Sequence, residues 1–196
     1  MKTAGMEGLF SKEQIEEHLG SHYLEQVKRL KEIEARICKA GTAFANSTYC
    51  DLRALKKALV YAENSIRLHE CYFTSLGGAA PGPCSELLHG LGRDFGSEQE
   101  WEEQFVALGL CSRGWVVLGF DLRNGRLCNY LADDPAEGAW LVLPLLVLDV
   151  CEHAYCRDYF DRLAYIKAFI AHIDWNVVSR RYSAAREMYL CGKAFI

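Results

Sequence analysis

The sequence lacks a hydrophobic run long enough to cross a membrane. Such a span needs about 18 uncharged apolar residues, whereas the longest run covers only residues 139–148. The chain also lacks an excess of basic residues, because 22 Lys and Arg stand against 26 Asp and Glu, and the formal net charge is −4. A chain of this charge is not expected to hold nucleic acid or an anionic membrane surface through bulk electrostatics.

Cysteine pairs of the C-x-x-C type are absent as well, although the chain has nine cysteines. Their spacing gives no support to a zinc ribbon or a thioredoxin-like redox motif. The N-terminus turns acidic before the apolar core of a signal peptide is formed. An odd number of cysteines without an export signal fits reduced thiols. We therefore expect a soluble, cytoplasmic protein in which most cysteines are small buried apolar side chains.

The apolar content is sufficient for a sizeable core. Of the 196 residues, 51% are hydrophobic and 12% aromatic, which excludes long disorder and suits one compact unit or two small subdomains. The clearest break is the segment GGAAPGPC at residues 77–84. We place the domain boundary there, between an N-terminal α-hairpin domain at 1–78 and a C-terminal α+β domain at 84–196.

The N-terminal domain is predicted to consist of two long helices. Ser11 and Gln14 form a capping-box start, and apolar residues then recur every three or four positions up to Ile37. A second helical pattern covers residues 51–76. The second helix must pack antiparallel to the first, which gives a helical hairpin.

The C-terminal domain is predicted to contain helices around a three-stranded antiparallel sheet. A second capping box, Ser97 with Glu100, opens a helix. The strands WVVLGFD and RLCNYLA flank the turn signal Asn124-Gly125. The run WLVLPLLVLD is a third, well-buried strand, with Pro144 near its middle or at a bulge. Helical periodicity returns after the third strand, so the fold class is α+β.

Several polar residues lie where they are able to form a site. His18 and His22 are four residues apart on one helix, so both can point into one site, or they are two ordinary core or surface histidines. His69 lies on the second helix. The buried strand of LLVLDVCEHAY ends in Asp149, and His153 follows as a helix begins. A carboxylate there is costly to bury unless a cation or hydrogen bonds satisfy it; the alternative is an N-cap for the following helix.

Taken together, these segments resemble the iron/manganese superoxide dismutase family from about Ser11 to Tyr182. HLGSHYLEQV is similar to its H-x-x-x-H-x-x-x-Y-V helix, and LHECYFTSLGG to its N-H-x-x-x-W segment. FGS, RGWVVLGF and PLLVLDVCEHAY resemble F-G-S, G-W-x-W-L and P-L-L-x-x-D-V-W-E-H-A-Y-Y, the last being the most specific. RLAY and DWNVV continue the likeness into the C-terminal helices.

The resemblance implies one Fe or Mn ion per subunit, with the metal ligands His18, His69, Asp149 and His153. It implies a homodimeric, antioxidant oxidoreductase that converts superoxide to oxygen and hydrogen peroxide. Nitrogen ligands with one hard oxygen donor suit either metal. The alternative is a metal-binding, superoxide-dismutase-like homodimer with little dismutase activity and a different redox or scaffold role.

Four further positions carry implied roles. His22 corresponds to a second-sphere histidine near the substrate channel. Glu152 corresponds to a glutamate that reaches the partner subunit's ligand histidine, which would orient that imidazole. Arg162 in RLAY corresponds to an arginine at the funnel, a local cation for an anionic substrate. Trp115 corresponds to a tryptophan of the pocket wall, or is plain core.

The outer positions depart from the family pattern. Gln26 stands at the gateway tyrosine, Cys151 at a tryptophan and Cys156 at the second tyrosine of H-A-Y-Y. The glutamine that holds the metal-bound water is replaced by Asp133 in the manganese-type position and by Ser65 in the iron-type position. We expect Asp133 to be buried near Asp149 and to contact that solvent. These departures predict a slower dismutase.

Overall fold

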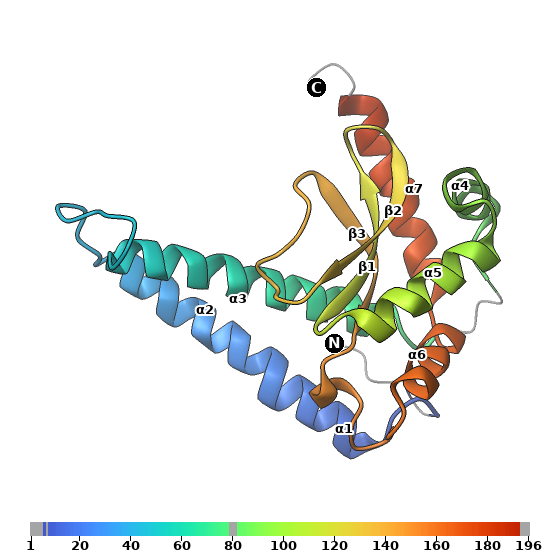
Figure 1. Ribbon diagram of the computed structural model, residues 1–196, viewed down its shortest axis with the longest axis horizontal. Helices are drawn as coiled ribbons and strands as arrows, with labels where there is room; N and C mark the ends of the chain where they lie inside the picture. Colours follow the sequence, from blue (N-terminus) through green and yellow to red (C-terminus); the bar gives the residue numbers. More distant parts are fainter. Residues whose placement is uncertain (1–5, 7, 79–81, 193–196) are drawn as a thin grey trace.

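A helical hairpin forms the N-terminal part of the protein in the computed structural model, which describes residues 6, 8–78 and 82–192 (Figure 1). Its first arm consists of α1 (Lys12–Glu17), η1 (His18–Tyr23) and α2 (Leu24–Ile37), and its second arm is α3 (Asp51–Thr74). The predicted hairpin is confirmed. The first arm is not a plain α-helix, however, because η1 is a π-helical segment, a widened turn that a 3.6-residue periodicity does not reveal.

The C-terminal part surrounds a small sheet with helices (Figure 1). In chain order the elements are α4 (Ser85–Phe95), α5 (Glu98–Cys111), β1 (Trp115–Asp121), β2 (Arg126–Ala132), β3 (Val142–Asp149), η2 (Glu152–Ala154), α6 (Arg162–Ala171) and α7 (Trp175–Gly192). The strand order is β2-β1-β3, with both pairings antiparallel. The predicted α+β class and three-stranded sheet are confirmed.

The third strand is shorter than predicted and carries the expected bulge. It begins at Val142, because Trp140 is 92% exposed and belongs to the preceding loop. The register between β1 and β3 shifts at Leu118/Gly119, where Gly119 pairs with Pro144. A proline is tolerated here because β3 is an edge strand with a partner on one side only. Beyond the bulge the pairing runs on to Trp115 opposite Asp149, at the end of the strand.

One hydrophobic core joins the hairpin to the sheet. It includes Ile15 and Tyr72 from the hairpin, Trp115 and Leu146 from the sheet, and Phe169 from α6. The predicted domain boundary falls at 77–84, of which 79–81 lie outside the described residues. None of the helices in the described part of the chain combines the length and the apolar character that a membrane span requires.

The bulge generates a stability prediction. Gly119→Ala places a methyl group against Cγ1 of Val142 at the bulged pairing. We expect the free energy of unfolding to fall by about 1–3 kcal/mol, a typical cost of overpacking. Gly92→Ala, in α4 with open space around the new methyl group, is the matched control. It should instead stabilise by about 0.4–1 kcal/mol. Urea unfolding measures both, and equal effects would contradict the packing argument.

Candidate metal centre

Three imidazoles converge on one carboxylate at the junction of the hairpin and the sheet. The potential ligand atoms of His18, His69, Asp149 and His153 all lie within 4.8 Å of one another. Oδ2 of Asp149 is 3.2 Å from Nε2 of His18, 3.9 Å from Nε2 of His69 and 3.4 Å from Nε2 of His153. The structure thus brings together the residues that the sequence proposed as ligands.

Each of these side chains comes from a different element. His18 opens the π-helical segment η1, and His69 lies in the last turns of α3. Asp149 is the final residue of β3, and His153 lies in the short 3-10 helix η2. Isolated π-helical turns are frequent at functional sites.

The Asp149 carboxylate is not the N-cap of the following helix, because the N-cap of η2 is Cys151, without a side-chain cap hydrogen bond. Oδ1 of Asp149 instead accepts a hydrogen bond from the backbone N–H of Cys151 at 2.9 Å, in the turn that follows β3. Oδ2 faces the three imidazoles. The residue therefore starts the turn with one oxygen and offers the other to the cluster.

Burial and the neighbouring charges together shift the pKa values of Asp149 and His69. Asp149 is fully buried, and His18 and His69 are 2% and 3% exposed. Burial raises the pKa of the Asp149 carboxyl, but the neighbouring His153 and His18 imidazoles lower it by more, so its net pKa lies well below the ordinary value. Burial lowers the pKa of His69 to about 4, although Asp149 opposes this shift. At neutral pH the site thus contains a carboxylate and, at His69, an uncharged imidazole.

Two buried nitrogen atoms lack a hydrogen-bond partner among the described residues. They are Nε2 of His69 and Nε2 of His153. Nδ1 of His69 lies 2.7 Å from the carbonyl oxygen of Ser65, which only accepts, so Nδ1 carries the proton and Nε2 keeps its lone pair. Buried polar atoms without partners require an explanation. A cation bound by three imidazoles and one carboxylate explains both, and this donor set suits iron or manganese.

Aromatic side chains enclose the cluster. The hydroxyl of Tyr165 donates to the backbone oxygen of Asp149 at 2.7 Å and lies 3.1 Å from the hydroxyl of Tyr72. The Trp115 ring meets the His69 ring edge-on at 4.9 Å, and Phe73 lies 4.8 Å from the His18 ring. Trp115 therefore lies in the wall of the site while also being core, which combines the two alternatives proposed for it.

His22 lies at the edge of the cluster. Its ring stacks on that of His153, with centroids 3.8 Å apart and planes within 10°. Burial lowers the pKa of His22, and the neighbouring His153 and His18 lower it further. Two hydrogen bonds hold the guanidinium of Arg162 in place. It donates to the backbone oxygen of Ser112 at 2.9 Å and to the Tyr155 hydroxyl at 3.1 Å.

Asp133 is not where the sequence placed it. The expectation that it is buried near Asp149 is wrong, because Asp133 is exposed in the turn after β2. Its Oδ1 accepts from the backbone N–H of Arg113 at 2.9 Å, and its own N–H donates to Glu137. The Asp133 carboxylate is thus taken up by the backbone of the loop before β1, twenty residues earlier in the chain, and this competes with any contact to buried solvent.

Gln26 and Cys151, two further positions that depart from the family pattern, lie in different surroundings. Gln26 lines a cavity of about 550 Å³ together with Tyr61 of α3 and Asp134. Cys151 packs its Sγ against the backbone oxygens of Arg113 and Gly114, and burial, followed by the charge of Asp149, raises the pKa of its thiol well above the ordinary value.

Three more of the predicted positions lie close in sequence or space to the ligands. Cys156 and Glu152 are exposed in the turn that carries His153. Ser65 is buried, and its hydroxyl lies 3.4 Å from Nδ1 of His69.

Sequence reasoning missed two residues of the site. Gln14 was interpreted only as part of a helix cap, yet its side-chain Nε2 donates to the backbone oxygen of His153 at 2.7 Å. Tyr165 entered only as a letter of RLAY, and no local pattern predicted its hydrogen bond to the backbone of Asp149. The one available signal for Gln14 was its spacing, four residues before His18 on the same helix face.

Comparison with known proteins agrees with this geometry. The family model for "Iron/manganese superoxide dismutases, C-terminal domain" matches residues 83–181. The chain is 35% identical to "Superoxide dismutase [Fe]" of Aquifex aeolicus, with 100% of this chain and 94% of the relative covered. It is 38% identical to "Superoxide dismutase [Fe]" of Cupriavidus metallidurans, with 94% and 93% covered.

A further relative carries the other metal in its name. "Superoxide dismutase [Mn] 1" of Halobacterium salinarum is 34% identical, with 62% of each chain covered. The fold and the buried cluster define a metalloprotein of mixed helix–sheet architecture, and the chain belongs to the iron/manganese superoxide dismutase family.

The cluster predicts metal-dependent stability that requires Asp149. Metal should raise the thermal midpoint of the wild-type protein, by the equivalent of about 4 kcal/mol at a thousandfold excess over the dissociation constant. Asp149→Asn should lose this gain, because the carboxylate ligand is gone.

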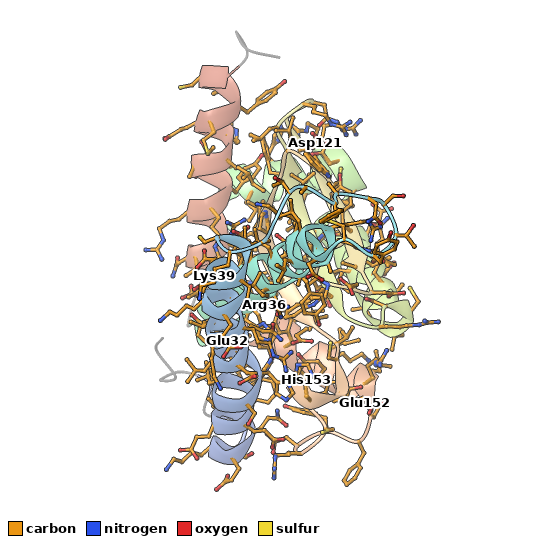
Figure 2. The ribbon with its side chains drawn as sticks, turned by 90° about the vertical axis from the view of Figure 1, so that its left-hand side faces the viewer. Glu32, Arg36, Lys39, Asp121, Glu152 and His153 are labelled. Atoms are coloured by element: carbon orange, nitrogen blue, oxygen red, sulfur yellow. The ribbon has the colours of Figure 1, made fainter. Side chains whose placement is uncertain are left out.

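Asp121→Asn is the matched control. This equally buried aspartate, which is labelled in Figure 2, is the last residue of β1 and pairs with Arg123. The control should lose stability but keep the response to metal. Metal analysis together with thermal unfolding measures both variants, and a fully metallated Asp149→Asn protein would contradict the assignment.

Proposed function

We propose that this protein is a superoxide dismutase that uses one iron or manganese ion per subunit. The observation that carries the proposal is the buried cluster of three imidazoles and one carboxylate, in which two imidazole nitrogens lack partners among the described residues. The names of these relatives support superoxide as the substrate. They favour this function over the alternative of a metal-binding scaffold.

His18, His69, Asp149 and His153 would hold the ion. A bound iron or manganese ion supplies reversible one-electron exchange, by which two superoxide anions and two protons become one dioxygen and one hydrogen peroxide. The chain's own contribution is to hold the donor atoms in a dry setting. The Ser65 carbonyl keeps the His69 lone pair turned toward the cluster, and the Tyr165 hydroxyl holds the backbone of Asp149.

Two residues at the edge of the cluster would serve the approach of the anionic substrate and the supply of protons. His22, half-buried and stacked on His153, is in position to hold or pass a proton near the site. Arg162 would supply a local positive charge beside it, which matters because the chain as a whole carries −4 and the substrate is an anion.

The substituted outer positions favour a slower enzyme than a typical member of the family. The Cys151 thiol and the Gln26 amide replace larger aromatic groups, and changes to groups that orient ligands typically cost about tenfold or more in affinity or activity.

Assembly as a homodimer in the cytoplasm completes the proposal. Glu152 is exposed in the single chain, and Phe160, at the end of the same turn, is fully exposed. Figure 2 shows Glu152 farther from the hairpin than its neighbour His153. An exposed aromatic ring and an exposed carboxylate on the same segment of chain are groups that a partner subunit would cover.

The deciding experiment is a superoxide-consumption assay on protein stripped of metal and reloaded with iron or with manganese. At least one loaded form should consume superoxide faster than the same concentration of free metal. Asp149→Asn should reduce the rate to that of the metal-free protein. A wild-type protein that holds one metal per chain but consumes superoxide no faster than free metal would refute the dismutase function and leave the scaffold alternative.

The interface proposal makes a separate prediction. If Glu152 reaches the ligand histidine of the partner subunit, Glu152→Ala should weaken dimerisation and metal retention together, each by about tenfold. Sedimentation velocity and a chelator challenge measure the two effects. Glu187→Ala, which removes a carboxylate from α7, is the control and should change neither. A monomeric wild-type protein would contradict the proposed role of Glu152.

A further inference from the structure

The side chain of Gln14 connects the first helix to the turn that carries a metal ligand. Gln14 is only 1% exposed, although it is a polar residue in the first turns of α1. Its Nε2 donates to the backbone oxygen of His153 at 2.7 Å, and its Oε1 accepts from the backbone N–H of Arg157 at 3.2 Å. One amide therefore bonds to both ends of the segment 153–157.

The cap of α1 does not require this side chain. The capping serine accepts from the backbone N–H of Gln14, and the side-chain amide is directed to the opposite half of the molecule. A side-chain amide donates through its NH₂ group and accepts through its oxygen at the same time. A glutamate would lose the donor to the His153 carbonyl, and a methionine of similar volume would lose both bonds.

The turn that carries His153 has little regular structure of its own. The 3-10 helix η2 covers Glu152–Ala154 only, and the side chain of His153 is 28% exposed, whereas those of His18 and His69 are 2% and 4% exposed. The position of this ligand therefore depends on contacts from outside the turn. Figure 1 shows the segment after β3 running down to α1, which is where Gln14 meets it.

Other polar contacts join the same two stretches of chain. The backbone N–H of Ser11 donates to Asp158 at 2.6 Å, the Tyr159 hydroxyl donates to the backbone oxygen of Leu9 at 2.7 Å, and Arg157 pairs with Glu17. Of these contacts, only those of Gln14 reach the backbone of a ligand residue. Gln14 also lies four residues before the ligand His18 on its own arm of the hairpin.

We infer that Gln14 is a positioning residue for the metal centre. Its amide couples the helix of His18 to the turn of His153 and fixes the spacing of these two ligands within one subunit, without help from a partner chain. The inference rests on the proposed metal-binding function of the cluster, but the contact joins protein groups only and is therefore testable on the metal-free chain.

The first test is hydrogen–deuterium exchange on the metal-free full chain. Gln14→Met should raise the exchange rates of the Ala154, Tyr155 and Cys156 amides by about tenfold, because two hydrogen bonds that oppose local opening of the turn are lost. These amides donate hydrogen bonds within the turn, to the backbone oxygens of Cys151 and Glu152. If Gln14 acted only by filling space, a methionine of similar volume would replace it and the exchange rates would not change. Asp158→Ala, which removes a neighbouring contact of the same two stretches, is the control.

The second test uses the metal-loaded protein. Gln14→Met should shift the ligand-field spectrum and speed metal dissociation by about tenfold, whereas Asp158→Ala should keep the wild-type spectrum even if it lowers the thermal midpoint. Gln14→Glu keeps the acceptor for Arg157 but not the donor to His153. Gln14→Glu should show the same spectral shift, and it replaces Gln14→Met as the test variant if that protein does not fold.

The two arms separate the possible failures. If the Gln14 variants have wild-type exchange rates and a wild-type spectrum, the positioning role is wrong. If the wild-type chain binds no metal, the proposed function fails, and the exchange rates of the metal-free variants still decide whether Gln14 holds the turn.

Discussion

The burial of the Asp149 carboxylate is the constraint on which the rest of the structure depends. A fully buried anion is strongly unfavourable unless it is compensated, and here each oxygen has a defined use. One oxygen accepts from the backbone after β3, and the other faces three imidazoles and the place of a cation. The hairpin must deliver His18 and His69 to this point, and the turn after β3 must deliver His153. The geometry of both halves follows from this single charge.

The metal centre therefore also connects the helical hairpin to the C-terminal part of the protein. Neither the hairpin nor the sheet contains all the ligands, and the shared hydrophobic core brings the two together. Polar contacts then set the fine spacing: Tyr165 holds the backbone of Asp149, Ser65 orients His69, and Gln14 reaches from the first helix to His153. Contacts of this kind act on the ligands' backbone or outer atoms, so they orient the ligands without occupying the site itself.

Three residues that the sequence assigned to the site meet instead at one short loop. Arg162 donates to the backbone oxygen of Ser112, Asp133 accepts from the N–H of Arg113, and the Cys151 thiol packs on the oxygens of Arg113 and Gly114. This loop leads into Trp115, whose ring faces His69. Arg162, Asp133 and Cys151 thus bond to the backbone of the loop that precedes Trp115.

Much of the architecture was determined by the sequence alone. The apolar periodicities predicted the hairpin, and the turn signal at Asn124-Gly125 separated two strands whose bounds were predicted correctly. Both features depend on local spacing along the chain, whereas the ligand set was implied by the resemblance to the iron/manganese superoxide dismutase family. Only the tertiary structure decided that the helix widens at His18, that Gln14 points away from its own cap, and that Asp133 remains exposed. The placements of Gln14 and Asp133 depend on partners distant in sequence, because a polar side chain takes the donor or acceptor that packing brings nearest.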